Sequence, residues 1–119
     1  MRSILEAISL LRCDNVLECF FGLNELDVSI YRALLGGPMR SQEVAKKVGR
    51  GENAVYKSLQ KLLMCGLVVR EKKCADGGGY YYVYSAVKPE KIAERMRNSV
   101  EELRRRLLRA VDDFESSFR

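Results

Sequence analysis

Hydrogen-bonding and basic side chains recur at helical spacing in the stretch ENAVYKSLQK, residues 52–61. This spacing places Val55 and Leu59 on one apolar face of a helix. The opposite face carries Asn53, Tyr56, Lys57, Gln60 and Lys61. Amide side chains can pair with adenine, and lysine can reach guanine or a phosphate group. The chemistry expected of this face is recognition of duplex DNA by a helix lying in the major groove.

A basic hairpin is expected to follow this helix. Gly66 ends the helix, and residues 67–74 and 80–86 have the composition of two strands. The glycine-rich segment 75–79 joins them as a flexible tip. The hairpin would carry its basic side chains toward the DNA backbone beside the groove.

The DNA-binding side chains divide into two roles. Bases would be read by Asn53, Lys57 and Gln60. Glu52 would repel phosphate but could accept a hydrogen bond from cytosine. The predicted interface is completed by Ser41, Arg50, Tyr56, Lys61, Arg70, Lys72 and Lys73.

Two further helices are needed to position this face. Asn24 and Asp27 have the spacing of a capping box, which predicts a helix from residue 24 to residue 35. Its buried side would consist of Val28, Ile30, Tyr31, Leu34 and Leu35. Ser41 is expected to cap a shorter helix that ends at Gly49, and residues 49–51 form a tight turn. The elements therefore follow the order of a winged helix-turn-helix: a helix, a short helix, a turn, a longer helix and a hairpin.

The segments at both ends of the chain are also predicted to be helical. Near the N-terminus, apolar residues indicate a helix over residues 3–12, and Asp14 is expected to cap a second one. Pro89 begins a C-terminal helix that continues to the end of the chain. Its apolar stripe repeats every eleven residues and is interpreted as a homodimer interface, with packing within one chain as the alternative: Ile92, Met96, Val100, Leu103, Leu107, Val111, Phe114 and Phe118.

The fold class expected is therefore mainly α with one small β-hairpin, in a single domain of 119 residues. Its segments are an N-terminal helical part (1–23), the winged helix-turn-helix (24–87) and the dimerisation helix (88–119). The net charge is +5. Residues 41–87 hold eight basic and four acidic side chains, a surplus of +4, which favours a polyanionic partner.

Several function classes are disfavoured by what the sequence lacks. It has no histidine, no C-x-x-C pair and no phosphate-binding loop, so we expect no enzyme activity, no metal and no cofactor. It has no membrane-length apolar run and no signal peptide, so we expect a cytoplasmic protein without a membrane partner. The four cysteines are interpreted as small buried hydrophobes, with Cys74, beside two lysines, as the alternative redox-sensitive thiol.

The sequence also resembles a known family. The resemblance rests on GLNELDVSIYRALL, GPMRSQEVAKKVG, AVYKSLQKLLMCGLVVREK and GGYYYVYSAV, taken in this order. These segments are similar to the DNA-binding domain of archaeal TrmB-type transcription regulators, and more loosely to the MarR group. The resemblance implies that the helix starting near Glu52 is the recognition helix and that the hairpin is the wing. The chain departs from the family at Arg50 and Gly51, where an apolar residue and a hydroxyl cap are usual, and at Glu52 and Asn53, where Arg or Ser is common.

Three functions are compatible with these features. The first is a homodimeric regulator that reads a pseudo-palindromic site, the second a weakly specific architectural DNA-binding protein, and the third a winged-helix module that binds a protein of the transcription machinery. Tyr56 could instead pack within its own domain. The arginines at 104, 105, 106 and 109 are interpreted as a solvated face paired with nearby acidic residues.

Overall fold

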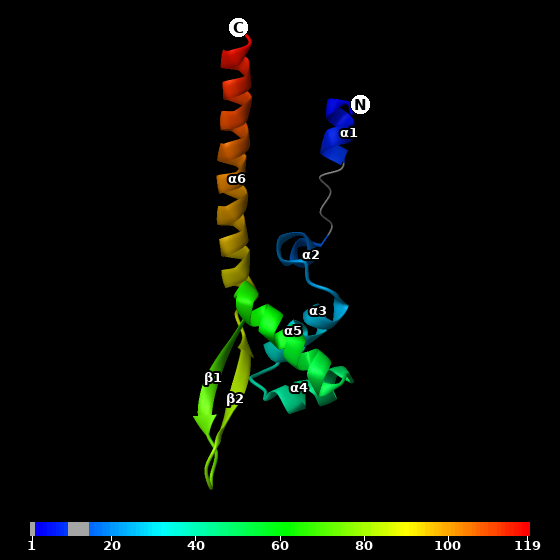
Figure 1. Cartoon of the computed structure of the whole chain (residues 1–119), viewed down its shortest axis with the longest axis vertical. Coiled ribbons are helices and arrows are strands. Elements are labelled where there is room, and N and C mark those ends of the chain that lie inside the picture. Colours follow the sequence, from blue (N-terminus) through cyan, green and yellow to red (C-terminus); the bar gives the residue numbers. More distant parts are fainter. Residues whose placement is uncertain (1, 10–14) are drawn as a thin grey trace. The chain divides into compact units, whose positions relative to one another are not determined.

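The computed structural model describes residues 2–9 and 15–119. The chain divides into two compact units, residues 1–86 and 87–119. The first unit contains the helices α1 to α5 and one hairpin, and the second contains the single helix α6 (Figure 1). The element bounds are α1 Ile4–Ser9, α2 Val16–Phe21, α3 Glu25–Leu35, α4 Ser41–Val48, α5 Glu52–Cys65, β1 Val68–Cys74, β2 Tyr80–Ala86 and α6 Pro89–Ser117.

The core of the first unit forms where α3, α4 and α5 pack on one another and on the base of the hairpin (Figure 1). Each helix contributes apolar residues at helical spacing, and these side chains are almost fully removed from water. The most deeply buried are Ile30, Leu34, Val44, Val55, Leu59, Leu62, Leu67 and Val68. The predicted winged helix-turn-helix is therefore confirmed.

Helix α3 begins as the sequence predicts. The Asn24 side chain accepts a hydrogen bond from the Asp27 backbone N–H at 2.9 Å, and the Asp27 carboxylate accepts one from the Asn24 N–H at 2.9 Å. This reciprocal capping box fixes the first turn. Leu35 was expected to be buried but is 46% exposed, because it lies at the last position of α3, where the chain turns away at Gly36.

Two predicted caps are wrong. The N-cap of α4 is Arg40, and Ser41 is the first helical residue. The start of α4 is closed by Glu43, whose carboxylate accepts the Arg40 backbone N–H at 3.0 Å. The N-cap of α2 is Asn15, whose amide oxygen accepts the Leu17 N–H at 3.0 Å. The residue predicted for this role, Asp14, lies outside the described residues, as does the predicted helical segment 10–12.

The hairpin is a regular antiparallel pair that runs from Val68 opposite Ala86 to Cys74 opposite Tyr80. At its tip the three glycines 77–79 all have positive φ, a conformation that side-chain-bearing residues rarely adopt. On the outer edge of β2, Met39 exchanges two backbone hydrogen bonds with Tyr84, at 3.0 and 2.8 Å. This bridge ties the hairpin to the loop between α3 and α4.

The second unit is helix α6, with Pro89 at its first position as predicted. Ile92 is only 4% exposed and Met96 is half-buried, whereas the rest of the predicted stripe, from Val100 to Phe118, is exposed. The arginines are paired along the helix: Arg104 with Glu101 at 3.2 Å, Arg105 with Glu102 at 3.4 Å and Arg106 with Glu102 at 3.1 Å. Their interpretation as a solvated, ion-paired face is confirmed for these three arginines, whereas Arg109 is exposed with no ion pair among the described residues.

Candidate nucleic-acid interface

The outer face of α5 presents polar side chains to solvent. Glu52, Asn53 and Lys57 are exposed, and Tyr56 is 54% exposed, so about half of the Tyr56 surface is open to solvent. Within the part of the chain that the structure describes, Asn53 and Lys57 have neither a hydrogen-bond partner nor an ion-pair partner for their side chains. These side chains are available to a ligand that approaches the outer face of the helix.

Further along α5, Gln60 and Lys61 differ from that group. Gln60 is half-buried, and its amide nitrogen Nε2 is buried with no hydrogen-bond partner among the described atoms. The Lys61 ammonium lies 2.5 Å from the Asp27 carboxylate, and its side chain is 39% exposed. The structure therefore does not bring these two side chains onto the same open surface as Asn53 and Lys57.

Asp27 is the centre of a polar cluster that joins α3 to α5. It is 1% exposed, and its carboxylate accepts hydrogen bonds from the Ser58 hydroxyl, the Lys61 ammonium and the Asn24 backbone N–H. Burial alone would raise the pKa of Asp27, but the hydrogen bonds from Lys61, Ser58 and Asn24 outweigh burial and hold that pKa below its ordinary value of 3.8. Asp27 is thus ionised and fully partnered inside the domain.

Sequence reasoning found Asp27 only as part of a capping box and missed its bond to α5. Two signals were present. Ser58 lies among the apolar positions Val55, Leu59 and Leu62, where a polar residue needs a buried partner. Lys61 follows Ser58 by three residues and so lies on a neighbouring part of the helix surface. The identity of the partner depends on tertiary packing, because Asp27 and Lys61 are 34 positions apart.

One face of the hairpin combines aromatic and basic side chains. The Arg70 guanidinium lies 4.1 Å from the centroid of the Tyr82 ring, and the Lys72 ammonium lies 4.0 Å from that of Tyr80. The two tyrosine rings meet edge to face at 5.7 Å. Cation–π contacts of this kind restrict where the charges can point while leaving them accessible.

The strand register shows how this face is related to the core. Side chains alternate across a strand, so Val68, Arg70 and Lys72 point to the same side of the sheet. Val68 is buried at the base, and so is Tyr84, which lies opposite Arg70 on the same face. The face that covers the core near α5 therefore continues outward as the exposed basic and aromatic surface.

The remaining predicted interface residues lie in separate places. Lys73 is exposed on the other face of the hairpin, opposite Tyr81, and the Arg40 guanidinium lies 4.1 Å from the centroid of the Tyr81 ring. Arg50 is exposed in the turn before α5, and Ser41 is half-buried at the first position of α4. Sequence reasoning did not single out Arg40, although it lies only one residue before the predicted interface residue Ser41.

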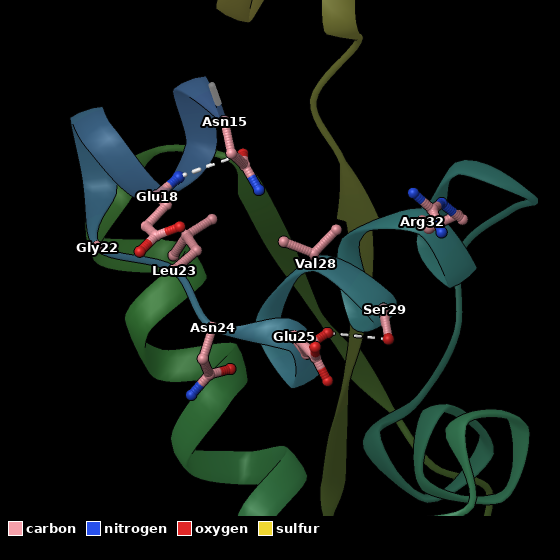
Figure 2. Close-up of a pocket in the computed structure, with 9 residues that line it drawn as sticks. All are labelled: Asn15, Glu18, Gly22, Leu23, Asn24, Glu25, Val28, Ser29 and Arg32. Carbon is pink, nitrogen blue, oxygen red and sulfur yellow. Dashed lines mark hydrogen bonds between the residues drawn. The ribbon is translucent and has the colours of Figure 1, made fainter. Parts of the chain in front are cut away.

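A polar pocket of about 930 Å³ lies between α2 and α3, and Figure 2 shows its lining residues. Several of its polar groups already have partners. The Asn15 amide oxygen accepts the Glu18 backbone N–H at 3.4 Å, and the Ser29 hydroxyl donates to the Glu25 carbonyl at 2.9 Å. The pocket is wide and polar and contains none of the predicted DNA-binding residues. Its lining consists of Asn15, Glu18, Gly22, Leu23, Asn24, Glu25, Val28, Ser29 and Arg32.

Cysteines and acidic residues do not form a metal site in the described ranges 2–9 and 15–119, where no cluster of three or more metal-ligating side chains occurs. Cys65 is half-buried and Cys74 is exposed, both as free thiols, while Cys19 is disulfide-bonded. The interpretation of the cysteines as small buried hydrophobes is therefore wrong for Cys19 and Cys74, which are exposed, and Cys13 lies outside the described residues. No helix in the described part of the chain is long and apolar enough to span a membrane.

The fold, with an accessible polar face on the second helix of the helix-turn-helix and a basic hairpin beside it, defines a winged-helix transcriptional regulator and not an enzyme. The family model described as sugar-specific transcriptional regulator TrmB matches residues 17–90. The chain belongs to the TrmB family, as its sequence resemblance implied.

The chain is also similar to two archaeal relatives and to a solved structure with the same fold. An uncharacterized protein of Methanocaldococcus jannaschii is 31% identical over 103 residues, which cover 86% of this chain and 78% of that protein. A second uncharacterized protein from the same organism is 34% identical over 82 residues, 68% of each chain. A possible transcriptional regulator from Methanosarcina mazei shares the fold with a TM-score of 0.71 at 22% identity, over 82% of this chain and 84% of the other.

Proposed function

We propose that the protein is a homodimeric DNA-binding regulator, in which α5 enters the major groove and the hairpin β1–β2 lies beside it as the wing. The observation that carries this proposal is the outer face of α5. There the Asn53 and Lys57 side chains are exposed and have no partner among the described residues, while the inner face is fully buried. A helix with this division can dock on its own domain and still offer donors and acceptors to base edges.

The base-reading set that we propose is smaller than the set expected from the sequence. Asn53 and Lys57 would read bases, and Tyr56 would contact the sugar–phosphate backbone or a base. Lys61 is left out because its ammonium is already paired with Asp27. Gln60 would have to leave its half-buried position before its amide could reach a base.

Phosphate contacts would come from the wing and the turn. Arg70 and Lys72 are held against tyrosine rings, and Lys73 and Arg50 are exposed. Phosphate contacts position a protein on DNA and supply most of the salt dependence of binding. Two copies joined through α6 would read half-sites separated by one or more whole turns of DNA, each about 34 Å or roughly 10 base pairs, on DNA in the cytoplasm.

The test compares two lysine variants by fluorescence anisotropy on a duplex from upstream of the protein's own gene. Lys57→Ala should weaken binding by about tenfold or more, because a base contact contributes about 1–3 kcal/mol. Lys91→Ala removes the same charge from an exposed position on α6 and should bind within about twofold of the unchanged protein.

Equal affinities of the Lys57→Ala and Lys91→Ala variants would contradict the placement of α5 in the groove. Tight binding that does not discriminate between sequences would indicate an architectural protein. If neither variant nor the unchanged protein binds DNA at low salt, the winged helix instead serves a protein partner.

A further inference from the structure

Helix α6 carries an apolar stripe of eight residues, of which the last six are exposed. From Val100 onward the stripe residues are between 52% and 79% exposed, although each is a large apolar side chain. Exposed apolar surface of this extent on a helix indicates a contact with another molecule. The exposed stripe consists of Val100, Leu103, Leu107, Val111, Phe114 and Phe118.

We infer that two copies of α6 pair with each other in antiparallel orientation, with the two-fold axis near residue 109. This inference rests on the proposed homodimer and adds the orientation and register of its interface. Three independent features of the helix agree on this arrangement: the spacing of the apolar residues, their sizes and the placement of the charges.

The spacing of the stripe is nearly the same read in either direction. In an antiparallel pair centred at residue 109, two residues face each other when they lie equally far from residue 109 on opposite sides. The numbers of two facing residues therefore add up to about 218. Phe118 then faces Val100 and Val111 faces Leu107, each with a sum of 218, and Phe114 faces Leu103 with a sum of 217. Every exposed stripe residue therefore meets another stripe residue in the second copy.

The sizes of the facing side chains also fit the antiparallel arrangement. Each phenylalanine meets a smaller residue, Val100 or Leu103, so the thickness of the interface stays even along its length. A parallel pair would set Phe114 and Phe118 against their own copies at one end and Val100 against itself at the other. Such an interface would be overpacked at one end and underpacked at the other.

The charged residues beside the stripe place the two-fold axis of the antiparallel pair at nearly the same residue. Arg104 and Glu115 directly follow Leu103 and Phe114 and are eleven residues apart, so they lie on the same edge of the stripe. The two-fold axis of an antiparallel pair is perpendicular to both helices. It therefore places one edge of the stripe in the first copy beside the same edge of the stripe in the second copy. Arg104 then faces Glu115 of the second copy when the centre is at residue 109.5, within one residue of the centre from the apolar layers.

A parallel pair would lack this match. It would place each arginine of the run 104–106 at the same height as the same run in the second copy. In the antiparallel pair Arg104, which flanks the stripe, lies instead beside Glu115 of the second copy. Charges that flank an apolar seam set the orientation of paired helices more than their affinity.

The orientation can be measured by electron–electron double resonance between nitroxide labels on the full chain. Each label is attached through a single unnatural amino acid, which leaves the native cysteines unchanged. Asn98 and Arg109 are exposed and eleven residues apart, so labels there have the same lateral geometry and differ only in height. The antiparallel pair predicts an axial offset of about 33 Å at position 98 and almost none at position 109, at 1.5 Å per residue.

The result expected is a label separation that is longer at position 98 than at position 109 by more than about 10 Å. Equal separations at the two positions would overturn the antiparallel inference and leave the proposed homodimer standing. The absence of any dipolar coupling at both positions, with helicity retained, would overturn the homodimer itself. DNA binding by the same labelled chains, measured in parallel, tests the proposed function separately from the orientation.

Discussion

Two lysines of α5 should respond in opposite ways to the same substitution. Sequence reasoning placed both Lys57 and Lys61 at the DNA, but the Lys61 ammonium lies 2.5 Å from the buried Asp27 carboxylate. Replacing Lys61 by methionine keeps an unbranched apolar side chain and removes the charge. The Asp27 carboxylate, 1% exposed, would keep hydrogen bonds from Ser58 and Asn24 but lose its counter-charge.

The loss of stability expected for Lys61→Met depends on how deeply Lys61 and Asp27 are each buried. Removing one partner of a fully buried ion pair costs about 3–5 kcal/mol. Because the Lys61 side chain is 39% exposed, solvent screens the pair, and we expect Lys61→Met to lower the free energy of unfolding by about 2–3 kcal/mol. Lys57→Met, at an exposed position without a partner among the described residues, should change it by less than about 0.5 kcal/mol.

The difference should depend on pH in a defined direction. The pKa of Asp27 in the folded protein lies below its ordinary value, so its contribution to stability is present above that ordinary value and is lost as pH falls through the folded pKa. Without Lys61, burial raises the pKa of Asp27 and the carboxyl can become neutral. The difference in the free energy of unfolding between the unchanged protein and the Lys61→Met variant should therefore be largest near pH 7. It should become smaller below about pH 4.

Urea unfolding followed by circular dichroism at 25 °C measures these differences directly. Anisotropy on the same samples separates the two roles, because Lys57→Met should weaken DNA binding while leaving the unfolding midpoint in place. If Lys61→Met unfolds at the same urea concentration as Lys57→Met at pH 7, the buried ion pair does not hold α3 to α5 and the assignment of Lys61 to the core is wrong.

Three further perturbations test other parts of the structure. Arg104→Glu should weaken dimerisation by roughly tenfold in sedimentation experiments because it sets a carboxylate opposite Glu115 of the second copy at both ends of the α6 pair, whereas Arg105→Glu, which loses a similar contact within its own helix, should change it by less than about twofold. Lys72→Ala should reduce the slope of log affinity against log salt by about 1, and an unchanged slope would show that this wing lysine is not at a phosphate. Asn24→Ala should lower the free energy of unfolding by about 1 kcal/mol in urea titrations, since it removes the side-chain half of the capping box of α3.

The elements of this fold could be predicted because their ends have local causes. Gly66 adopts a positive φ of 77° after the last turn of α5, and Pro89 occupies the first position of α6. The predicted bounds of α5, 52–65, and of the second strand, 80–86, match the structure, and the first strand begins one residue later than predicted. Glycine, proline and hydrophobic spacing act within a few residues, so the sequence alone contains that information.

The details of the interface could not be predicted because they depend on distant residues. Lys57 and Lys61 look equivalent on a helical projection, and only the packing of α3 against α5 separates them. The burial of the Gln60 amide nitrogen likewise depends on tertiary packing. The prediction of Ser41 as the N-cap of α4 failed for a local reason. The Glu43 carboxylate accepts the Arg40 backbone N–H, so the helix is capped one residue earlier, at Arg40.

The central claim is that this chain binds DNA at a specific site through α5 and the wing. Its most direct test is the affinity of the unchanged protein for a duplex from upstream of its own gene and for a scrambled duplex of equal length, measured across a salt series. The account predicts an affinity ratio of about 10³ or more in favour of the natural sequence, and a steep loss of both affinities with salt. Failure to bind either duplex at low salt would contradict it.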